Sequence, residues 1–173
     1  MPGGELGGRL VWMRLHPGPC VGECEMKILL AVDESRFSDA AVEVVIDRAQ
    51  PKSDEVRVLH VVEPPPLLLT REMGGYEPKL EEMLQRQLQE AETLVNKTAG
   101  KLERKGFRVT TDVEEGDPRS RILDIASQWH ADLIVLGCHG RRGVERFLMG
   151  SVSEGVARHA PCSVQIIRKP PEH

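Results

Sequence analysis

The sequence is poor in aromatic residues and contains no long apolar run. Phenylalanine, tryptophan and tyrosine make up 3% of its 173 residues, so the stacking platforms that bind single-stranded nucleic acid are missing. No apolar run approaches the roughly 20 residues that span a bilayer. The apolar stretch around Trp12 is also shorter than the core of a secretory signal, which needs about 7–15 residues. We therefore expect a cytoplasmic protein without a membrane partner.

A basic excess and a cysteine framework are also absent. The formal net charge is −4, whereas a nucleic-acid-binding domain usually carries a basic surface, so we expect no nucleic-acid partner. The four cysteines are scattered, which predicts neither a disulfide framework nor a metal site. They are Cys20, Cys24, Cys138 and Cys162. The sequence also lacks a Walker A lysine, a kinase signature and a nucleophile–base pair at recognisable spacing, and so presents no catalytic set.

The length and composition of the chain indicate one domain that is preceded by a tail. A chain of 173 residues is close to the size of one domain, roughly 100–150 residues. Residues 1–25 are rich in glycine and proline and have no apolar periodicity, which predicts a flexible extension before a domain over 26–170. Because a strand pattern begins directly after Met26, we hypothesise that Met26 is the biological start. The alternative is a genuine flexible extension.

Strand and helix patterns alternate from Met26 onward. Apolar runs predict five strands, over 27–32, 55–62, 107–113, 133–136 and 163–168. Helical spacing and capping residues predict four helices: one capped by Ser38, one from Pro78 to Gly106, one capped by Asp117, and one over 151–159. Strands separated by helices indicate right-handed crossovers and a parallel sheet covered on both faces. The predicted fold is a doubly wound α/β three-layer sandwich of the flavodoxin-like or nucleotide-binding type.

One loop has the pattern expected for phosphate binding. Ligands of an open parallel sheet bind outside the carboxyl ends of its strands, and the strand over 133–136 is followed by Gly137, Gly140 and, after nine further residues, Gly150-Ser151. Glycine lets the backbone approach a phosphate closely, and a helix that begins at Ser151 directs its amides and its dipole toward an anion. The Ser151 and Ser153 hydroxyls add donors. The alternative is a long loop whose glycines merely serve its turns.

With these motifs the sequence resembles the universal stress protein family. The resemblance covers Met26 to Lys169 and depends on Asp33 after the first strand, Gly116-Asp117-Pro118 before an Ile-Leu-x-x-Ala helix, and Gly137-x-x-Gly140-x9-Gly150-Ser151. It implies a five-stranded sheet of order 3-2-1-4-5, of the adenine nucleotide alpha hydrolase-like type. The glycine pattern is the one associated with members that bind ATP. Cys138 stands where the family often has serine, which weakens the match little because the backbone does most of the binding.

The resemblance also implies which residues would bind ATP, and Mg²⁺ is the expected companion of the triphosphate. Adenine and ribose would contact Ala31, Val32, Asp33 and Val61. Ribose and phosphates would lie along the glycine loop, at Gly137, Gly140, Gly150, Ser151 and Val152, and the candidate set includes their neighbours Cys138, His139, Arg141 and Ser153. No residue pair identifies the ligands of the metal. Similar proteins form homodimers, often through the last strand, here Ser163 to Arg168.

Several residues keep a second interpretation. Asp33 either bonds a ribose hydroxyl or Mg²⁺, or forms the turn toward Ser38. Arg141 either neutralises phosphate charge or is merely solvated, and His139 either approaches phosphate or is simply exposed. His60, in the second strand, is interpreted as structural. We expect an ATP-binding regulatory or sensor module of the stress response; the alternatives are a slow ATPase or autophosphorylating enzyme, and a nucleotide-free protein-interaction adaptor.

Overall fold

A computed structural model describes residues 25–64, 77–140 and 149–168, without the side chains of 77–80. In these residues five parallel strands form one sheet in the order β3-β2-β1-β4-β5. The strands are β1 (Lys27–Ala31), β2 (Glu55–Val62), β3 (Arg108–Glu115), β4 (Leu133–Gly137) and β5 (Ser163–Ile167). The helices are α1 (Arg36–Arg48), α3 (Glu77–Glu103), α4 (Pro118–Trp129) and α5 (Ser151–His159). The predicted doubly wound α/β fold and its strand order are confirmed, while Arg141 and residues 1–24 lie outside the described residues.

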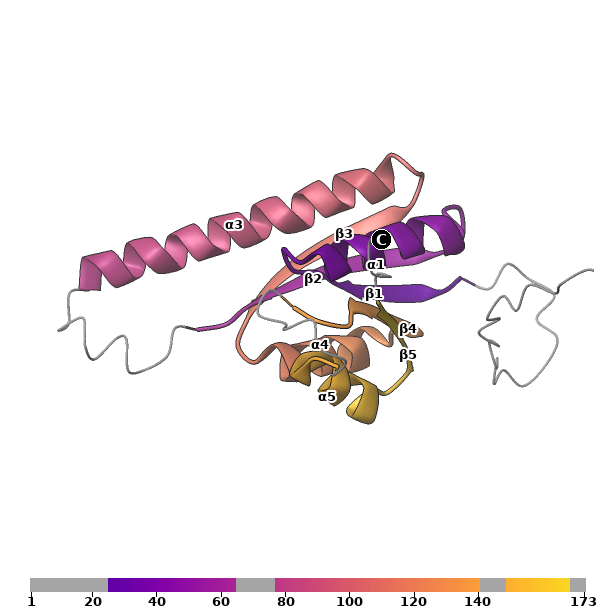
Figure 1. Ribbon diagram of the computed structural model, residues 1–173. Helices are drawn as coiled ribbons and strands as arrows, with labels where there is room; N and C mark the ends of the chain where they lie inside the picture. Colours follow the sequence, from indigo (N-terminus) through magenta and orange to yellow (C-terminus); the bar gives the residue numbers. More distant parts are fainter. Residues whose placement is uncertain (1–24, 65–76, 141–148, 169–173) are drawn as a thin grey trace, which may run out of the picture.

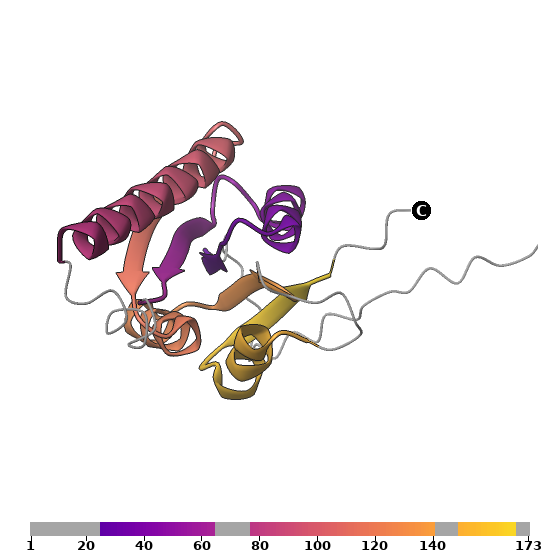
Figure 2. The same ribbon diagram turned by 60° about the vertical axis from the view of Figure 1, so that its left-hand side comes forward.

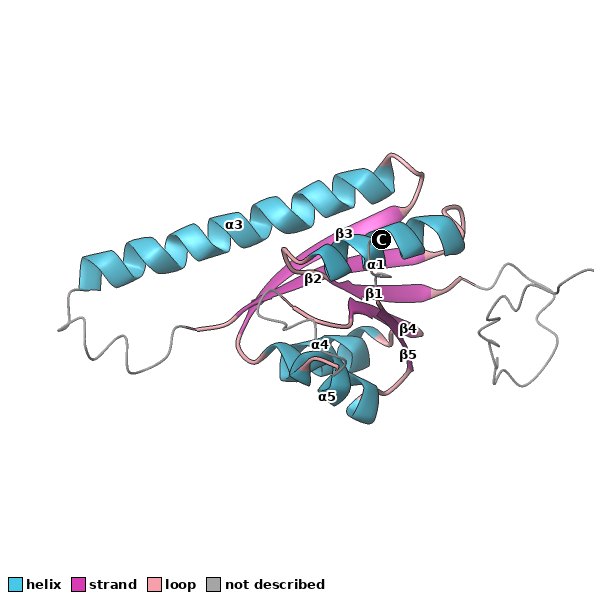
Figure 3. Cartoon of the chain, in the orientation of Figure 1, coloured by secondary structure: helices cyan, strands magenta, loops and turns pink. Residues whose placement is uncertain are grey.

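The helices cover the two faces of the sheet in pairs. Figures 1 and 2 show α1 and α3 on one face and α4 and α5 on the other, and Figure 3 shows the same three layers by secondary structure. Each face has its own apolar core. Leu30 of β1 packs with Val45 and Val95 on the first face, and Leu29 packs with Ile122 and Val156 on the second. Neighbouring residues of β1 therefore point into different cores, which is why this central strand is apolar throughout.

The amino terminus of α1 differs from the prediction. Ser35, rather than Ser38, is the N-cap: its side chain accepts a hydrogen bond from the Ser38 backbone N–H at 3.2 Å. The Ser38 hydroxyl instead accepts the Asp33 N–H at 3.0 Å. The helix therefore begins three residues earlier than the cap assignment predicted, and Ser38 ties it back to the end of β1. Asp117 caps α4 as predicted.

Helix α3 begins at Glu77, one residue before the predicted Pro78. In its second half Ala91, Val95 and Leu102 are buried against the sheet. Leu84 and Leu88 belong to the same predicted stripe but are only half-buried. Figure 1 shows the reason, because the amino-terminal part of α3 extends past the end of the sheet. In the part of the chain that the structure describes, no helix is both long and apolar enough to cross a membrane.

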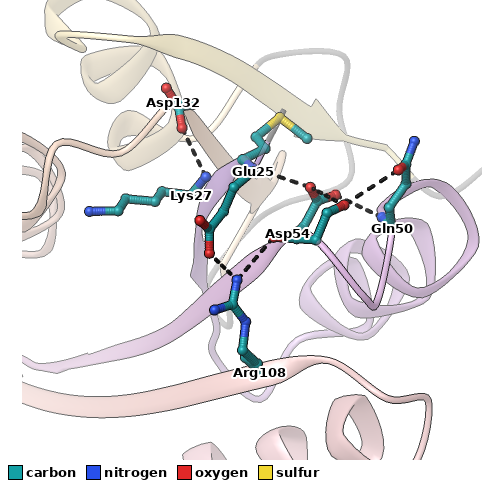
Figure 4. Close-up of polar contacts among 8 residues, drawn as sticks. Glu25, Lys27, Gln50, Asp54, Arg108 and Asp132 are labelled. Atoms are coloured by element: carbon teal, nitrogen blue, oxygen red, sulfur yellow. Dashed lines mark hydrogen bonds and ion pairs between the residues drawn. The ribbon is translucent and has the colours of Figure 1, made fainter. Parts of the chain in front are cut away.

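Charged side chains at the amino ends of the strands serve the fold (Figure 4). The Asp54 carboxylate is 3% exposed and accepts the backbone N–H groups of Met26 and Gln50, at 3.2 and 2.7 Å. Asp132 accepts the Lys27 N–H at 2.9 Å. Both carboxylates thus satisfy backbone donors where strands begin. The candidate site lies at the opposite edge of the sheet.

Candidate functional site

The predicted site residues meet at the carboxyl edge of the sheet. Val32 and Asp33 directly follow β1, Gly137 is the last residue of β4, and Gly150 directly precedes α5. The backbone connects two of these segments, because the Gly150 N–H donates to the Cys138 carbonyl at 2.9 Å. β1 and β4 are neighbours in the sheet, with connections that leave toward opposite faces, so this edge is the switch point where such folds bind ligands.

Asp33 forms a turn and also faces the glycine loop. Its Oδ1 accepts the Ser35 N–H at 3.0 Å, while its own N–H donates to Ser38. Its second oxygen, Oδ2, points toward Gly140, where an added Cβ would lie only 2.9 Å away. The two interpretations of Asp33 are therefore compatible. One oxygen fixes the turn, and the turn directs the other toward the loop after β4.

The three loop glycines meet different neighbours. A Cβ at Gly137 would lie 2.8 Å from Cβ of Phe37 in α1, and a Cβ at Gly150 would lie 3.1 Å from the Cys138 carbonyl oxygen. These two glycines are thus explained by the packing of the protein itself. A Cβ at Gly140 would instead approach the Asp33 carboxylate, at the exposed side of the loop.

Ser151, Val152 and Ser153 form the first turn of α5. Gly150 is the N-cap and contributes no side-chain hydrogen bond to this turn. The Ser151 side chain is exposed, and Val152 is half-buried against the second core. Because the first amides of a helix have no intrahelical acceptor, such an end carries partial positive charge and favours an anion.

Ser153 lies in the same turn but is directed inward. It is 3% exposed, and its hydroxyl is 2.9 Å from the carbonyl oxygens of both Cys138 and Gly150. A hydroxyl has one proton to donate, so these two contacts share it. Ser153 therefore joins the end of β4 to the start of α5 and fixes their relative position.

Cys138 and His139 are held against α1. The Cys138 Sγ lies 3.1 Å from His139 Nδ1, and the His139 ring lies 5.3 Å from the Phe37 ring, centroid to centroid. The Ser35 hydroxyl donates to the His139 carbonyl at 3.3 Å. Burial raises the pKa of the Cys138 thiol, so this group is protonated at neutral pH. His139 is thus half-buried and positioned, rather than simply exposed.

The end of β2 completes the arrangement. Val61 is half-buried in the penultimate position of this strand. The preceding residue, His60, is 9% exposed, and its Nδ1 lies 2.7 Å from the Val32 carbonyl oxygen. Ala31 is half-buried as the last residue of β1. All the predicted residues that the structure describes thus belong to this one edge.

Sequence reasoning missed the supporting residues at the start of α1, its N-cap Ser35 and Phe37. Ser35 and Phe37 contact His139, and Phe37 also explains the glycine at 137. The spacing Asp33-x-Ser35 was an available signal, because an aspartate side chain often accepts the backbone N–H two residues later. The local sequence does not predict the contact between Phe37 and Gly137, because this contact joins residues far apart in the chain.

The comparisons with known proteins agree with this architecture. The Universal stress protein family profile matches residues 26–168. Universal stress protein MJ0531 of Methanocaldococcus jannaschii is 36% identical over 144 residues, which are 83% of this chain and 82% of that protein. The structure of universal stress protein UspA from Lactobacillus plantarum is 28% identical with a TM-score of 0.72, and the match covers 83% of this chain and 97% of that chain.

A third relative is the universal stress protein from Archaeoglobus fulgidus, solved in complex with dAMP. It is 23% identical with a TM-score of 0.58, and the match covers 83% of this chain and 98% of that chain. This likeness shows a common fold. From the family match and the curated relative it follows that the chain belongs to the universal stress protein family.

Proposed function

We propose that this protein binds ATP at the carboxyl edge of its sheet and acts as a nucleotide-dependent regulatory module of the stress response. One observation carries the proposal: Gly140, which has no side chain, faces the Asp33 carboxylate beside the amino terminus of α5, whose N-cap, Gly150, makes no side-chain capping bond. An anion at the α5 amino terminus and a polar sugar near Asp33 are the ligand parts that suit these groups.

The remaining predicted residues have roles that match their surroundings. Ala31 and Val61, which are half-buried, offer apolar contacts to adenine and ribose at the ends of β1 and β2, and the buried Val32 leads the chain from β1 to Asp33. Ser151 and Val152 offer amides to the phosphates, while the Gly150 N–H, which is bonded to the Cys138 carbonyl, holds the start of α5 against the loop. Ser153 acts by holding the loop through Cys138, and His139 borders the same loop.

Asp33 is also the residue that suits Mg²⁺. Among the described residues no group of three His, Cys, Asp or Glu side chains is arranged to bind a metal. That fits a magnesium ion that arrives with the nucleotide, because such ions are usually held by one or two carboxylates, phosphate oxygens and water. The Asp33 Oδ2 would supply the carboxylate, and the ion would neutralise charge on the triphosphate.

The dAMP complex of the Archaeoglobus protein supports the chemical class of the ligand, because that nucleotide is bound on the same fold. The choice of ATP depends on this chain's own loop. A regulatory role is preferred to an enzymatic one because the sequence presents no nucleophile with a matching base.

The nucleotide that co-purifies with the full-length protein provides the first test. Denaturing the protein and separating the supernatant by ion exchange is expected to release intact ATP. Release of ADP alone would support slow hydrolysis instead. An empty protein that also binds no Mg·ATP in calorimetry would overturn the proposal and favour a protein-interaction adaptor.

Gly140→Val provides the second test. The branched side chain would displace the Asp33 carboxylate and occupy the space beside the loop. We expect the Kd for ATP to rise by about 100-fold, because two or more charge-assisted contacts are lost. Gly100→Val on α3 is the matched control, since a Cβ there meets only Arg104 Nη1 at 3.5 Å, an ordinary contact. Equal ATP affinity in the two variants would count against the site.

A further inference from the structure

His60 is a buried histidine that the proposed site does not use directly. It lies in β2, 28 residues from Val32, and its Nδ1 is 2.7 Å from the Val32 carbonyl oxygen. A carbonyl oxygen only accepts hydrogen bonds, so Nδ1 must carry the proton. The bond therefore fixes the tautomer of the neutral ring, which keeps its lone pair on Nε2.

Val32 connects this histidine to the candidate site. Its N–H donates to the Leu59 carbonyl at 2.9 Å, and its carbonyl accepts from His60, so both of its backbone groups are tied to β2. Val32 itself is 5% exposed. His60 bonds the peptide group that joins Val32 to Asp33. The orientation of this peptide group therefore determines the position of the Asp33 backbone.

The other side of Asp33 is held by α1. Its N–H donates to the Ser38 hydroxyl and its Oδ1 accepts the Ser35 N–H, each at 3.0 Å. Its Oδ2 is thereby directed at Gly140. Without the His60 bond, the Val32 carbonyl would lose its donor and the Val32–Asp33 peptide would be held only by the bond from the Asp33 N–H to Ser38, so that the peptide could tilt toward another donor and move Asp33 away from the loop.

We propose that His60 is a positioning residue of the nucleotide site, which acts by holding the Val32–Asp33 peptide in its binding orientation. The proposal rests on the proposed nucleotide binding, because Val32 and Asp33 are residues of that site. It predicts that the donor at the Nδ1 position matters and that the imidazole ring as such does not. A purely packing role predicts the reverse, namely that an apolar side chain of similar size replaces His60 without loss.

Two substitutions separate these roles in the full-length protein. His60→Asn places an amide N–H close to the position of Nδ1, and we expect its Kd for Mg·ATP to stay within about twofold of the wild type. His60→Leu fills the space without a donor, and we expect its Kd to rise about tenfold. Val58→Ala is the control for lost stability, because Val58 is fully buried two residues earlier in β2, toward the same core. We expect it to lower the stability and leave the Kd unchanged.

The tautomer provides a readout that needs no substitution. Nitrogen-15 NMR of the His60 ring in the wild-type protein is expected to show the proton on Nδ1 at a pH where the ring is neutral. A proton on Nε2 would overturn the proposal, even if His60→Leu does not fold. Mg·ATP binding with an unchanged Kd in a folded His60→Leu variant would also overturn it, and would leave the proposed function intact. Failure of the wild type to bind Mg·ATP would overturn both.

Discussion

Asp117 is the residue whose ionisation is most directly coupled to local structure. It caps α4, and its Oδ2 accepts both the Ser120 hydroxyl, at 2.7 Å, and the Ser120 backbone N–H, at 2.9 Å. These two hydrogen bonds, in that order, lower the pKa of Asp117 below its ordinary value of 3.8, with a smaller contribution from Arg119. The charged form is therefore favoured in the folded protein.

The sign of the resulting pH dependence follows from that direction. Because the pKa of Asp117 is lower in the folded than in the unfolded chain, its contribution to stability is complete above about pH 4 and is lost as the pH falls through the folded-state pKa. We expect Asp117→Ala to lower the free energy of unfolding by about 1 kcal/mol at pH 7, the usual cost of losing a cap. Urea denaturation followed by circular dichroism at several pH values from 7 down to 3 measures this difference, which should shrink at the acid end.

Asp117→Ser is the matched control, because serine caps a helix without a charge. Its stability relative to Asp117→Ala should not change over the same pH range. A difference between wild type and Asp117→Ala that stays constant down to pH 3 would contradict the assignment of the lowered pKa to this cap.

Helix N-caps could be predicted from the sequence where it offers a single capping residue, but not where it offers two. Asp117 followed by Pro118 leaves a single cap for α4, and that prediction is confirmed. Ser35 and Ser38 are both good caps by type, and Ser38 was the wrong choice. The selection depends on the turn in which Asp33 accepts the Ser35 N–H, which places Ser35 at the end of the helix.

At the scale of elements, α3 and the turn that follows it contain two glycines in opposite situations. Gly100 lies inside the helix, and a Cβ there meets only Arg104 Nη1 at 3.5 Å. Gly106 lies beyond the helix end with a φ of +90°, and its N–H donates to the Glu103 carbonyl at 2.9 Å. Side chains are tolerated at the first position, whereas the backbone at the second strongly favours glycine.

Alanine at these two positions should therefore shift stability in opposite directions. We expect Gly100→Ala to raise the free energy of unfolding by about 0.5 to 1 kcal/mol, because alanine has the higher helix propensity. Gly106→Ala should lower it by about 1 kcal/mol or more, because of the left-handed backbone conformation. Urea denaturation of each variant beside the wild type measures both shifts. Shifts of the same sign would show that the end of α3 is assigned incorrectly.

Elements with a clear period could be predicted closely, whereas contacts between distant elements could not. The predicted ranges 55–62 and 151–159 are the observed bounds of β2 and α5. The bond between His60 and Val32 depends on how β1 and β2 are aligned in the sheet, so the sequence indicated only that His60 is structural. The contact of Phe37 with Gly137 likewise requires α1 to lie over β4. Much of the candidate site is built from such contacts.

At the scale of the whole molecule, the two edge strands differ in charge. β3 carries Arg108, Asp112, Glu114 and Glu115, whereas β5, from Ser163 to Ile167, carries no charged residue. Charged side chains on an edge strand discourage pairing with another chain, and an uncharged edge strand permits it. Val164, Gln165 and Ile166 of β5 are half-buried in the isolated chain. We therefore propose that the protein is a homodimer that pairs through β5.

Ile166→Pro tests this arrangement without breaking the sheet of the single chain. The Ile167 carbonyl accepts the Cys138 N–H, so the backbone groups of Ile167 face β4 and those of Ile166 face outward. Proline at 166 removes an outward N–H that pairing between two copies would use. By light scattering after size exclusion we expect the wild type at about twice the 19.3 kDa chain mass and Ile166→Pro at about the chain mass itself. Ile166→Ala is the matched control, because it keeps the N–H and should remain dimeric. A folded Ile166→Pro variant with the mass of a dimer would place the interface elsewhere.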